Sequence, residues 1–256
     1  MLNTLIDIVK KAAEIMLSAQ NIKDNTESKG DRNFVTVYDK KVQKYIESEL
    51  KAIYPDILFM GEEGDSRTID LNTQNCFILD PIDGTANFRR SYRHSAISLG
   101  YCEKGVIKLG VVYDPYNNDL FYAERNKGAY HNKNRIFTED TALKNSFVGF
   151  GTSPYYPELS IKTMEAMPNI LADCEDIRRT GSAALDLAYI ACGRHDVFFE
   201  LQLSPWDYAA SVVIIEEAGG IITDDKGNTP KFDKPTPIFA GNKKAYKEFF
   251  DKNYFI

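Results

Sequence analysis

Two apolar segments of this chain each run directly into a pair of acidic residues. The first reads ILFMGEEG, from Ile57 to Gly64, and the second reads CFILDPIDG, from Cys76 to Gly84. A short apolar run of this kind is typical of a buried strand that ends where the acids begin. Neighbouring carboxylates repel each other, so folding alone gives no reason to collect them there. Either these stretches are solvated turns, or a positive group lies between the acids.

The rest of the chain carries helical and strand patterns in a regular order. Apolar spacing predicts helices over 2–16 and 36–53, a polar connection over 21–34, and three strands within 96–122. Later strands are predicted at 147–151, 174–179, 196–201, 220–224 and 237–241, between helices at 157–172, 183–191, 206–218 and 243–251. This order predicts layered α and β structure in one domain, 1–256, with two tightly packed lobes, about 1–145 and 146–256.

Composition excludes several classes of protein. The net charge is −6 and acids alternate with bases, so the chain lacks the basic stripe of a general nucleic-acid binder. No apolar run approaches the ~20 residues of a membrane span. The cysteines are scattered and form no CxxC pair, and we expect reduced thiols in a cytoplasmic protein; they are Cys76, Cys102, Cys174 and Cys192.

The acidic residues occupy positions where folds of this class bind ligands. Glu62, Asp80 and Asp83 follow predicted strands, Asp207 begins a predicted helix, and Asp39 lies near the start of another. Ligands of α/β proteins commonly lie beyond the carboxyl ends of strands. Mg²⁺ prefers oxygen ligands, and two ions about 4 Å apart can hold the attacking and leaving oxygens of a phosphoryl transfer.

Gly84 and Thr85 follow the second acidic pair. A helix that begins at this point would direct free backbone N–H groups towards a phosphate, and the Thr85 hydroxyl would orient a water molecule. Each motif alone is also compatible with an ordinary turn or helix start. Together they indicate a metal-dependent phosphatase.

Three motifs resemble those of one family. GEEG (Gly61–Gly64), DPIDGTANF (Asp80–Phe88) and PWDYAA (Pro205–Ala210) occur in the order found in the inositol monophosphatase family of Mg²⁺-dependent, lithium-sensitive phosphatases. The resemblance covers essentially the whole chain. It implies a five-layered αβαβα sandwich of the sugar-phosphatase type, a homodimer, and a small phosphate ester of inositol or a related sugar as substrate.

The resemblance also implies ligands for two Mg²⁺ ions, or three. Glu62, Asp80 and the Ile82 carbonyl would hold the first ion. Asp80, Asp83 and Asp207 would hold the second, and Glu62 would also lie near a third, weaker ion together with Asp39. Water activated by the first ion would attack phosphorus directly, oriented by Thr85 with help from Asp39.

The resemblance also implies substrate contacts at further positions of this chain. The N–H groups of Gly84 and Thr85 would bind phosphate oxygens, beside Asp83 and Asp207. Ala183 and Glu200 match positions that contact inositol hydroxyls. Lys29 matches a basic residue of the family's metal loop, although its spacing to FVT is one residue shorter.

The chain departs from the family after Phe88, where it reads RRSYRH. One hypothesis is that Arg89, Arg90 and Arg93 bind a second anionic group of the substrate; the alternative is a solvated basic face. Arg178 and Arg179 raise the same question, or serve a dimer contact.

Other functions remain as alternatives. Fructose-1,6-bisphosphatase or nucleotide 3′-phosphatase activity would use the same site, and some bacterial relatives of the family act as transcription accessories. A haloacid-dehalogenase-type phosphatase is disfavoured because Asp80 and Asp83 are three residues apart rather than two. No histidine lies in a zinc-ligand pattern, and His195 is expected at the surface or at a helix end.

Overall fold

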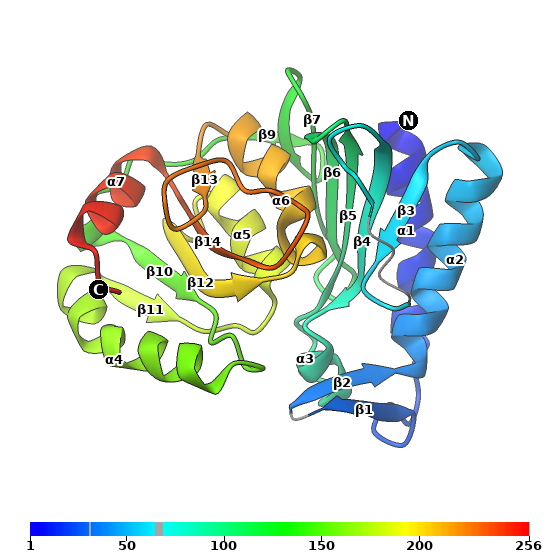
Figure 1. Cartoon of the computed structure of the whole chain (residues 1–256), viewed down its shortest axis with the longest axis horizontal. Helices are drawn as coiled ribbons and strands as arrows, with labels where there is room; N and C mark the ends of the chain where they lie inside the picture. Colours follow the sequence, from blue (N-terminus) through cyan, green and yellow to red (C-terminus); the bar gives the residue numbers. More distant parts are fainter. Residues whose placement is uncertain (31, 65–68, 256) are drawn as a thin grey trace.

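Two sheets dominate the structure, with helices between them and on both outer faces (Figure 1). The computed structural model describes residues 1–30, 32–64 and 69–255. The seven-stranded sheet contains, in spatial order, β3 (Leu58–Gly61), β4 (Asn75–Asp83), β5 (Ala96–Glu103), β6 (Val106–Asp114), β7 (Asp119–Glu124), β8 (Gly128–His131) and β9 (Asn134–Ile136). The five-stranded sheet contains β11 (Asp176–Arg178), β10 (Phe147–Phe150), β12 (Val197–Leu203), β14 (Thr236–Gly241) and β13 (Ile221–Thr223).

Six longer helices complete the layers. One outer pair, α1 (Leu2–Leu17) and α2 (Val37–Ile53), covers the seven-stranded sheet, and the other, α4 (Pro157–Asp173) and α7 (Lys243–Lys252), covers the five-stranded sheet. Between the sheets lie α5 (Ala183–Ala191) and α6 (Pro205–Glu217). The predicted five-layered αβαβα sandwich is therefore confirmed. The division into two lobes near residue 145 stays a prediction.

The central helix α6 is buried on nearly all sides, as its sequence requires. Its residues from Tyr208 to Ile215 are all buried, which suits a helix with apolar residues around its whole circumference. Strand β6 approaches it so closely that a Cβ at Gly110 would lie 2.2 Å from the Ala210 carbonyl oxygen. Only glycine allows this contact. The contact therefore fixes the distance between the seven-stranded sheet and the start of α6, where Asp207 lies.

Strand β4 carries the acidic motif, and its geometry changes within that motif. Its register with β5 shifts between Asp80 and Asp83, around Pro81, which has no N–H to donate to a neighbouring strand. Gly84 then takes a left-handed conformation, with φ 83°, and the short helix α3 (Thr85–Arg89) follows. The predicted helix start is present, but α3 has only five residues.

Two regions differ from the sequence prediction. The segment 21–34 is not only a polar connection, because β1 (Thr26–Gly30) pairs with β2 (Asn33–Thr36) in an antiparallel hairpin; Asp31 lies outside the described residues. Most of β1 is exposed, so its sequence has no buried face to reveal it. Strands β8 and β9 were not predicted because they are short and polar towards their ends.

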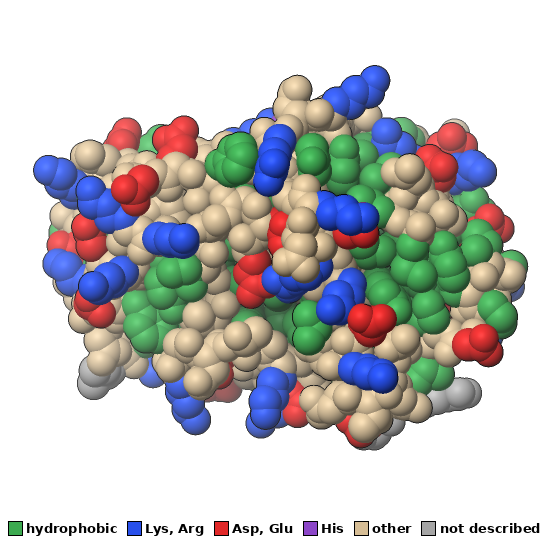
Figure 2. Space-filling model, turned by 90° about the horizontal axis from the view of Figure 1, so that it is seen from above, with side chains coloured by type: hydrophobic (Ala, Val, Ile, Leu, Met, Phe, Trp, Pro, Cys, Tyr) green, Lys and Arg blue, Asp and Glu red, His purple; other side chains and the backbone are tan. Residues whose placement is uncertain are grey.

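Charged side chains of both signs are interspersed on the face shown in Figure 2, as the alternation along the sequence suggested. Within the described ranges, every helix is too short or too polar to cross a bilayer.

Candidate active site

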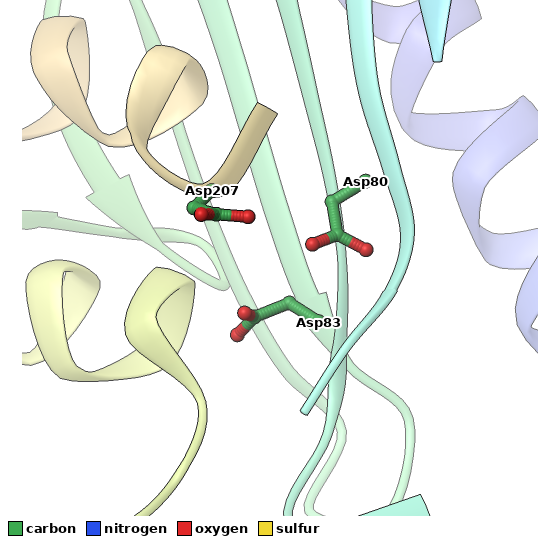
Figure 3. A group of neighbouring side chains, drawn as sticks. All are labelled: Asp80, Asp83 and Asp207. Atoms are coloured by element: carbon green, nitrogen blue, oxygen red, sulfur yellow. The ribbon is translucent and has the colours of Figure 1, made fainter. Parts of the chain in front are cut away.

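Three aspartates from distant parts of the chain meet between β4 and the start of α6 (Figure 3). One carboxylate oxygen from each of Asp80, Asp83 and Asp207 lies within 4.8 Å of the other two. Asp80 and Asp83 come from the end of β4, and Asp207 lies in the first turn of α6. The backbone N–H of Ser204 donates to Asp207 Oδ2 at 2.7 Å, so a capping interaction holds this carboxyl at the helix start.

This cluster gathers acidic groups that no described basic side chain balances. Burial raises the pKa of Asp80 well above its ordinary value, and repulsion from Glu62, Asp83 and Asp207 raises it further. Burial and the neighbouring acids act in the same direction on the pKa of Asp207. Among the described residues, no lysine or arginine makes an ion pair with Asp80, Asp83 or Asp207. Such a group of carboxyls is suited to a bound cation.

Glu62 lines the same cavity beside the aspartates. Burial raises its pKa to about 8, whereas the charge of Lys29 acts in the opposite direction. Lys29 Nζ lies 3.8 Å from Glu62 Oε1 and 2.5 Å from Glu63 Oε1. The structure thus places Lys29 beside the acidic loop, despite the shortened spacing in the sequence.

Asp39 and Thr85 form a second, connected pair. Thr85 Oγ1 lies 3.1 Å from Asp39 Oδ1 and 3.0 Å from the Ile82 carbonyl oxygen, so its single proton has two acceptors within reach. Thr36, the N-cap of α2, donates from its backbone N–H to Asp39 Oδ2 at 2.8 Å. Burial raises the pKa of Asp39 to about 6, which leaves it mostly ionised at neutral pH.

Asp83 is held by residues that sequence reasoning did not select. Its Oδ2 accepts hydrogen bonds from the Ser182 hydroxyl and from the Ala184 N–H, the latter at 3.0 Å. Burial raises the pKa of Asp83 to about 6, and these hydrogen bonds oppose that rise. Ser182 lies in the motif RRTGSAALD, which pointed to Ala183 but gave no sign that the preceding hydroxyl reaches Asp83.

The predicted substrate residues line one cavity of about 330 Å³ together with the acidic cluster. They are Gly84, Thr85, Ala183 and Glu200. Glu200 Oε1 accepts from the Ser153 N–H at 2.7 Å, and burial raises the Glu200 pKa to about 7. Asp39 is buried and contacts Thr85, which lines the cavity. All predicted site residues are therefore in one region, and their individual roles stay predictions.

The role of the arginines in RRSYRH stays a prediction, although the described lining of the cavity contains other arginines. Neither Arg89, Arg90 nor Arg93 is among the described residues that line the cavity. The guanidinium of Arg89 instead packs 3.7 Å from the ring centre of Phe34. The arginines that do line the cavity are Arg32 and Arg179.

His195 follows the end of α5, one of its two predicted locations, but it is not at the surface. It is buried, with 5% of its surface exposed, and its Nδ1 lies 3.5 Å from Asp186 Oδ1. Burial lowers its pKa to about 4, so the imidazole is neutral at physiological pH. It lies in the packed turn that follows α5 and not on the surface, because the chain turns back there into β12.

Comparison with known proteins agrees with this geometry. A profile of the inositol monophosphatase family matches residues 1–252. The Nus factor SuhB of Escherichia coli K12 is 36% identical over 96% of this chain and 93% of its own length. The fructose-1,6-bisphosphatase/inositol-1-monophosphatase of Thermotoga maritima is 38% identical over 87% and 84%.

A solved structure gives the same result for the fold. The crystal structure of the extragenic suppressor protein SuhB from Bartonella henselae superposes with a TM-score of 0.90 and 34% identity, over 97% of this chain and 96% of that one. The match extends over both sheets and all layers. This chain belongs to the inositol monophosphatase family.

Proposed function

We propose that this protein is an Mg²⁺-dependent phosphomonoesterase that hydrolyses inositol monophosphate or a related sugar phosphate. The observation that carries the proposal is the convergence of Asp80, Asp83 and Asp207 in one cavity beside the Thr85–Asp39 pair. Members of the family act on small phosphate esters, and the T. maritima relative is named for two such activities.

The residues present fit magnesium. Asp80, Asp83 and Asp207 offer carboxylate oxygens that are buried or half-buried, repel one another and have no cationic partner among the described residues. One ion would be held by Asp80, Asp83 and Asp207. Another would be held by Glu62, Asp80 and the Ile82 carbonyl. A third ion would lie near Glu62 and Asp39. When bound, magnesium lowers the pKa of water and stabilises charge on the phosphate and on the departing oxygen.

Thr85 and Asp39 would prepare the attacking water. The Thr85 hydroxyl donates towards Asp39 or the Ile82 carbonyl, so its lone pairs remain to accept a hydrogen bond from water. That contact orients the water oxygen towards phosphorus. Asp39, mostly ionised near pH 7, supplies the negative charge that draws the water proton towards this side of the cavity.

Other groups that line the same cavity would hold the substrate. The first N–H groups of a helix have no partner within the helix, and those of Thr85 and the preceding Gly84 would bind phosphate oxygens. Ala183 and Glu200 would contact the ring hydroxyls, with Glu200 as the acceptor. The P–O ester bond then breaks as the new P–O bond to water forms.

A panel of esters tests the proposal. Phosphate release would be measured from inositol 1-phosphate, fructose 1,6-bisphosphate and a nucleotide 3′-phosphate, each with Mg²⁺ and with EDTA. Release from inositol 1-phosphate or a sugar phosphate only with Mg²⁺ is expected. Absence of release from every ester, with folded protein and Mg²⁺ present, would refute it.

A second candidate function comes from the names of relatives. Several similar proteins, including that of E. coli, are called Nus factor SuhB, which favours an accessory role in transcription with secondary catalysis. Tight binding to purified bacterial RNA polymerase or RNA, without ester hydrolysis, would support this candidate. Hydrolysis without such binding would support the enzyme.

We also propose a homodimer, as the family resemblance implies. Light scattering coupled to gel filtration would give about twice the chain mass of 29.0 kDa. A mass equal to one chain at micromolar concentration would contradict it.

A further inference from the structure

Arg89 lies at the end of α3, and its side chain contacts a strand from an earlier part of the chain. The central carbon of its guanidinium lies 3.7 Å from the centre of the Phe34 ring, which belongs to β2. At this distance the cation is well within the reach of a cation–π interaction with the face of the ring. Arg89 is half-buried and its Nε is covered, so water is partly excluded from the contact. Exclusion of water strengthens such a contact, which is called the Arg89–Phe34 stack below.

The hairpin that carries Phe34 is otherwise largely on the surface. Most of β1 is exposed, and in β2 only the last two residues are buried. Glu27 of β1 forms an ion pair with Lys40 of α2, but both side chains are exposed, and such pairs contribute little to stability. The position of the hairpin therefore depends strongly on contacts of β2 such as the Arg89–Phe34 stack.

The stack connects two segments that line the same cavity. The cavity lining includes Phe34 with the two residues before it, and Thr85 with the residue on either side of it. Figure 1 shows β2 directly beside α3. The stack thus joins the hairpin to the short helix whose first N–H groups would bind phosphate. A hairpin that moved away from α3 would take one wall of the cavity with it.

The hairpin also carries a positive charge that faces the acidic loop. Lys29 of β1 lies 2.5 Å from Glu63 Oε1 and 3.8 Å from Glu62 Oε1. A hairpin held against α3 keeps this charge beside Glu62, whereas a displaced hairpin would remove it. The position of the hairpin therefore affects both the wall of the cavity and the charge beside a predicted metal ligand.

Arg89 is the first residue of RRSYRH, the segment in which this chain departs from its family. It is not among the described residues that line the cavity, so an effect on hydrolysis has to act through the hairpin. The next residue, Arg90, carries the same charge and is exposed, which makes it a natural control for the position of the hairpin.

We propose that Arg89 is a positioning residue, whose stack on Phe34 holds the β1–β2 hairpin against α3 and so keeps one wall of the cavity in place. The effect on hydrolysis rests on the phosphatase function stated above, but the position of the hairpin is measurable without turnover. Loss of the stack lowers the population of molecules in which the hairpin lies against α3. Because only that population has a complete cavity, the apparent affinity for the ester falls in proportion.

Limited digestion with trypsin measures the hairpin directly. Lys29 and Arg32 are trypsin sites in the hairpin, and the bonds that follow them become accessible when the hairpin leaves the fold. In EDTA, Arg89→Ala is expected to raise the rate of cleavage after these residues by about fivefold or more, the effect of one cation–π contact. Mass spectrometry identifies the fragments.

Four further variants identify the stack as the cause. Phe34→Leu keeps an apolar side chain but removes the ring, and it should raise the cleavage rate as Arg89→Ala does. The double variant should be cleaved no faster than either single one, because both changes break the same contact. Arg89→Lys keeps the cation without the planar guanidinium and should give an intermediate rate. Arg90→Ala should be cleaved within the hairpin at the native rate.

Steady-state kinetics with inositol 1-phosphate at saturating Mg²⁺ give the second reading. Arg89→Ala should raise KM by about threefold or more, while kcat changes by less than about twofold, because the reacting groups are unchanged once the ester is bound. Arg89→Lys should restore part of the KM. Melting temperatures would confirm that each variant is folded, and Phe34→Leu serves in the digestion if Arg89→Ala does not fold.

Several results would overturn the proposal. Native rates of hairpin cleavage in both Arg89→Ala and Phe34→Leu would show that the stack does not hold the hairpin, whether or not the protein hydrolyses an ester. Additive effects in the double variant would mean that the two side chains act separately. Faster cleavage with an unchanged KM would remove the link to the cavity. Faster cleavage in a protein that hydrolyses no ester would instead refute the phosphatase function and support the role of the stack.

Discussion

Thr85 Oγ1 lies 3.1 Å from Asp39 Oδ1, although the two residues are 46 positions apart in the chain. Asp39 belongs to the first turn of α2, on the outer face of the seven-stranded sheet, and Thr85 begins α3 after the acidic end of β4. The contact connects the outer helical layer to the cavity. It also gives the Thr85 hydroxyl a defined direction, because its proton points to an acceptor within the protein.

The Thr85 hydroxyl should be essential for turnover. Thr85→Val keeps the side-chain shape but cannot hydrogen-bond water, so kcat is expected to fall by about 10²–10⁴-fold. Thr85→Ser keeps the hydroxyl and should lose less than about tenfold. Steady-state phosphate release at saturating Mg²⁺ measures both. Similar activity in Thr85→Val and the native protein would show that this hydroxyl does not orient water.

Asp207→Asn should abolish activity without damaging the fold. The amide still accepts the Ser204 N–H, but it removes a negative charge from the cation site. We expect kcat/KM to fall by at least about 10³-fold, with a melting temperature in EDTA equal to or above the native value because repulsion is relieved. Asp83→Asn should behave in the same way. Asp225→Asn, an exposed change outside the cavity, should leave both quantities unchanged.

Stability without metal should fall as pH rises. Burial raises the pKa of Glu62 to about 8 and of Asp83 to about 6, above the values of about 4 in an unfolded chain. Between about pH 4 and about pH 8 the folded protein binds more protons than the unfolded chain. The free energy of unfolding therefore decreases with increasing pH over that range.

Magnesium should reverse that loss, because it binds the same ionised oxygens. The gap between melting temperatures in Mg²⁺ and in EDTA is therefore expected to widen from about pH 6 to about pH 8. Differential scanning fluorimetry at several pH values measures it. A gap that stays constant with pH would show that the buried carboxyls are not the metal ligands.

Gly84→Ala should disturb both stability and activity. Gly84 has φ 83°, and an added Cβ would lie 3.0 Å from the Gly181 carbonyl oxygen and 3.1 Å from that of His94. Backbone strain and crowding together cost about 2–5 kcal/mol, or roughly 5–15 °C in melting temperature for a domain of this size.

Gly105→Ala is the matched control for that change. Gly105 has nearly the same φ, 82°, but its nearest contact to an added Cβ is 3.5 Å away, so only the backbone strain applies. Thermal melts and phosphate release would be compared. A larger loss in Gly105→Ala than in Gly84→Ala would contradict the role given to the Gly181 contact.

Lithium should inhibit hydrolysis, as the family resemblance implies. Li⁺ is a small, hard cation that takes oxygen ligands, but with half the charge of Mg²⁺ it stabilises a departing oxygen less well. Inhibition is expected at submillimolar to millimolar LiCl, with KCl at the same ionic strength as the control. Equal rates in the two salts would argue against a lithium-sensitive cation site.

Much of the architecture could be predicted from local patterns. Helix α5 occupies the predicted residues 183–191, and α2 begins directly after Thr36 as expected. These elements have apolar residues at regular spacing, because each packs one or more faces into a core, and that spacing is visible in the sequence. The hairpin β1–β2 packs few side chains, so its sequence carries no such signal.

The candidate site likewise has residues that the sequence predicted and contacts that it did not. The acids of β4 and α6 could be recognised from the sequence, since carboxylates gathered at strand ends and a helix start repel one another and suit a cation when the fold brings them together. The sequence did not show which groups donate hydrogen bonds to these acids. Ser182 donates to Asp83 across 99 residues, and nothing in a local pattern records a contact between segments so far apart.

The arginines show most clearly what tertiary structure decided. Arg178 and Arg179 are adjacent and chemically identical, yet one is paired with Asp176 beside Phe147 and the other lines the cavity. The sequence by itself determined that the chain carries acids suited to a cation and which layers form around them. Only the folded chain decided which positive charges face the cavity, because that depends on the direction in which each side chain leaves its loop and on the neighbours it meets there.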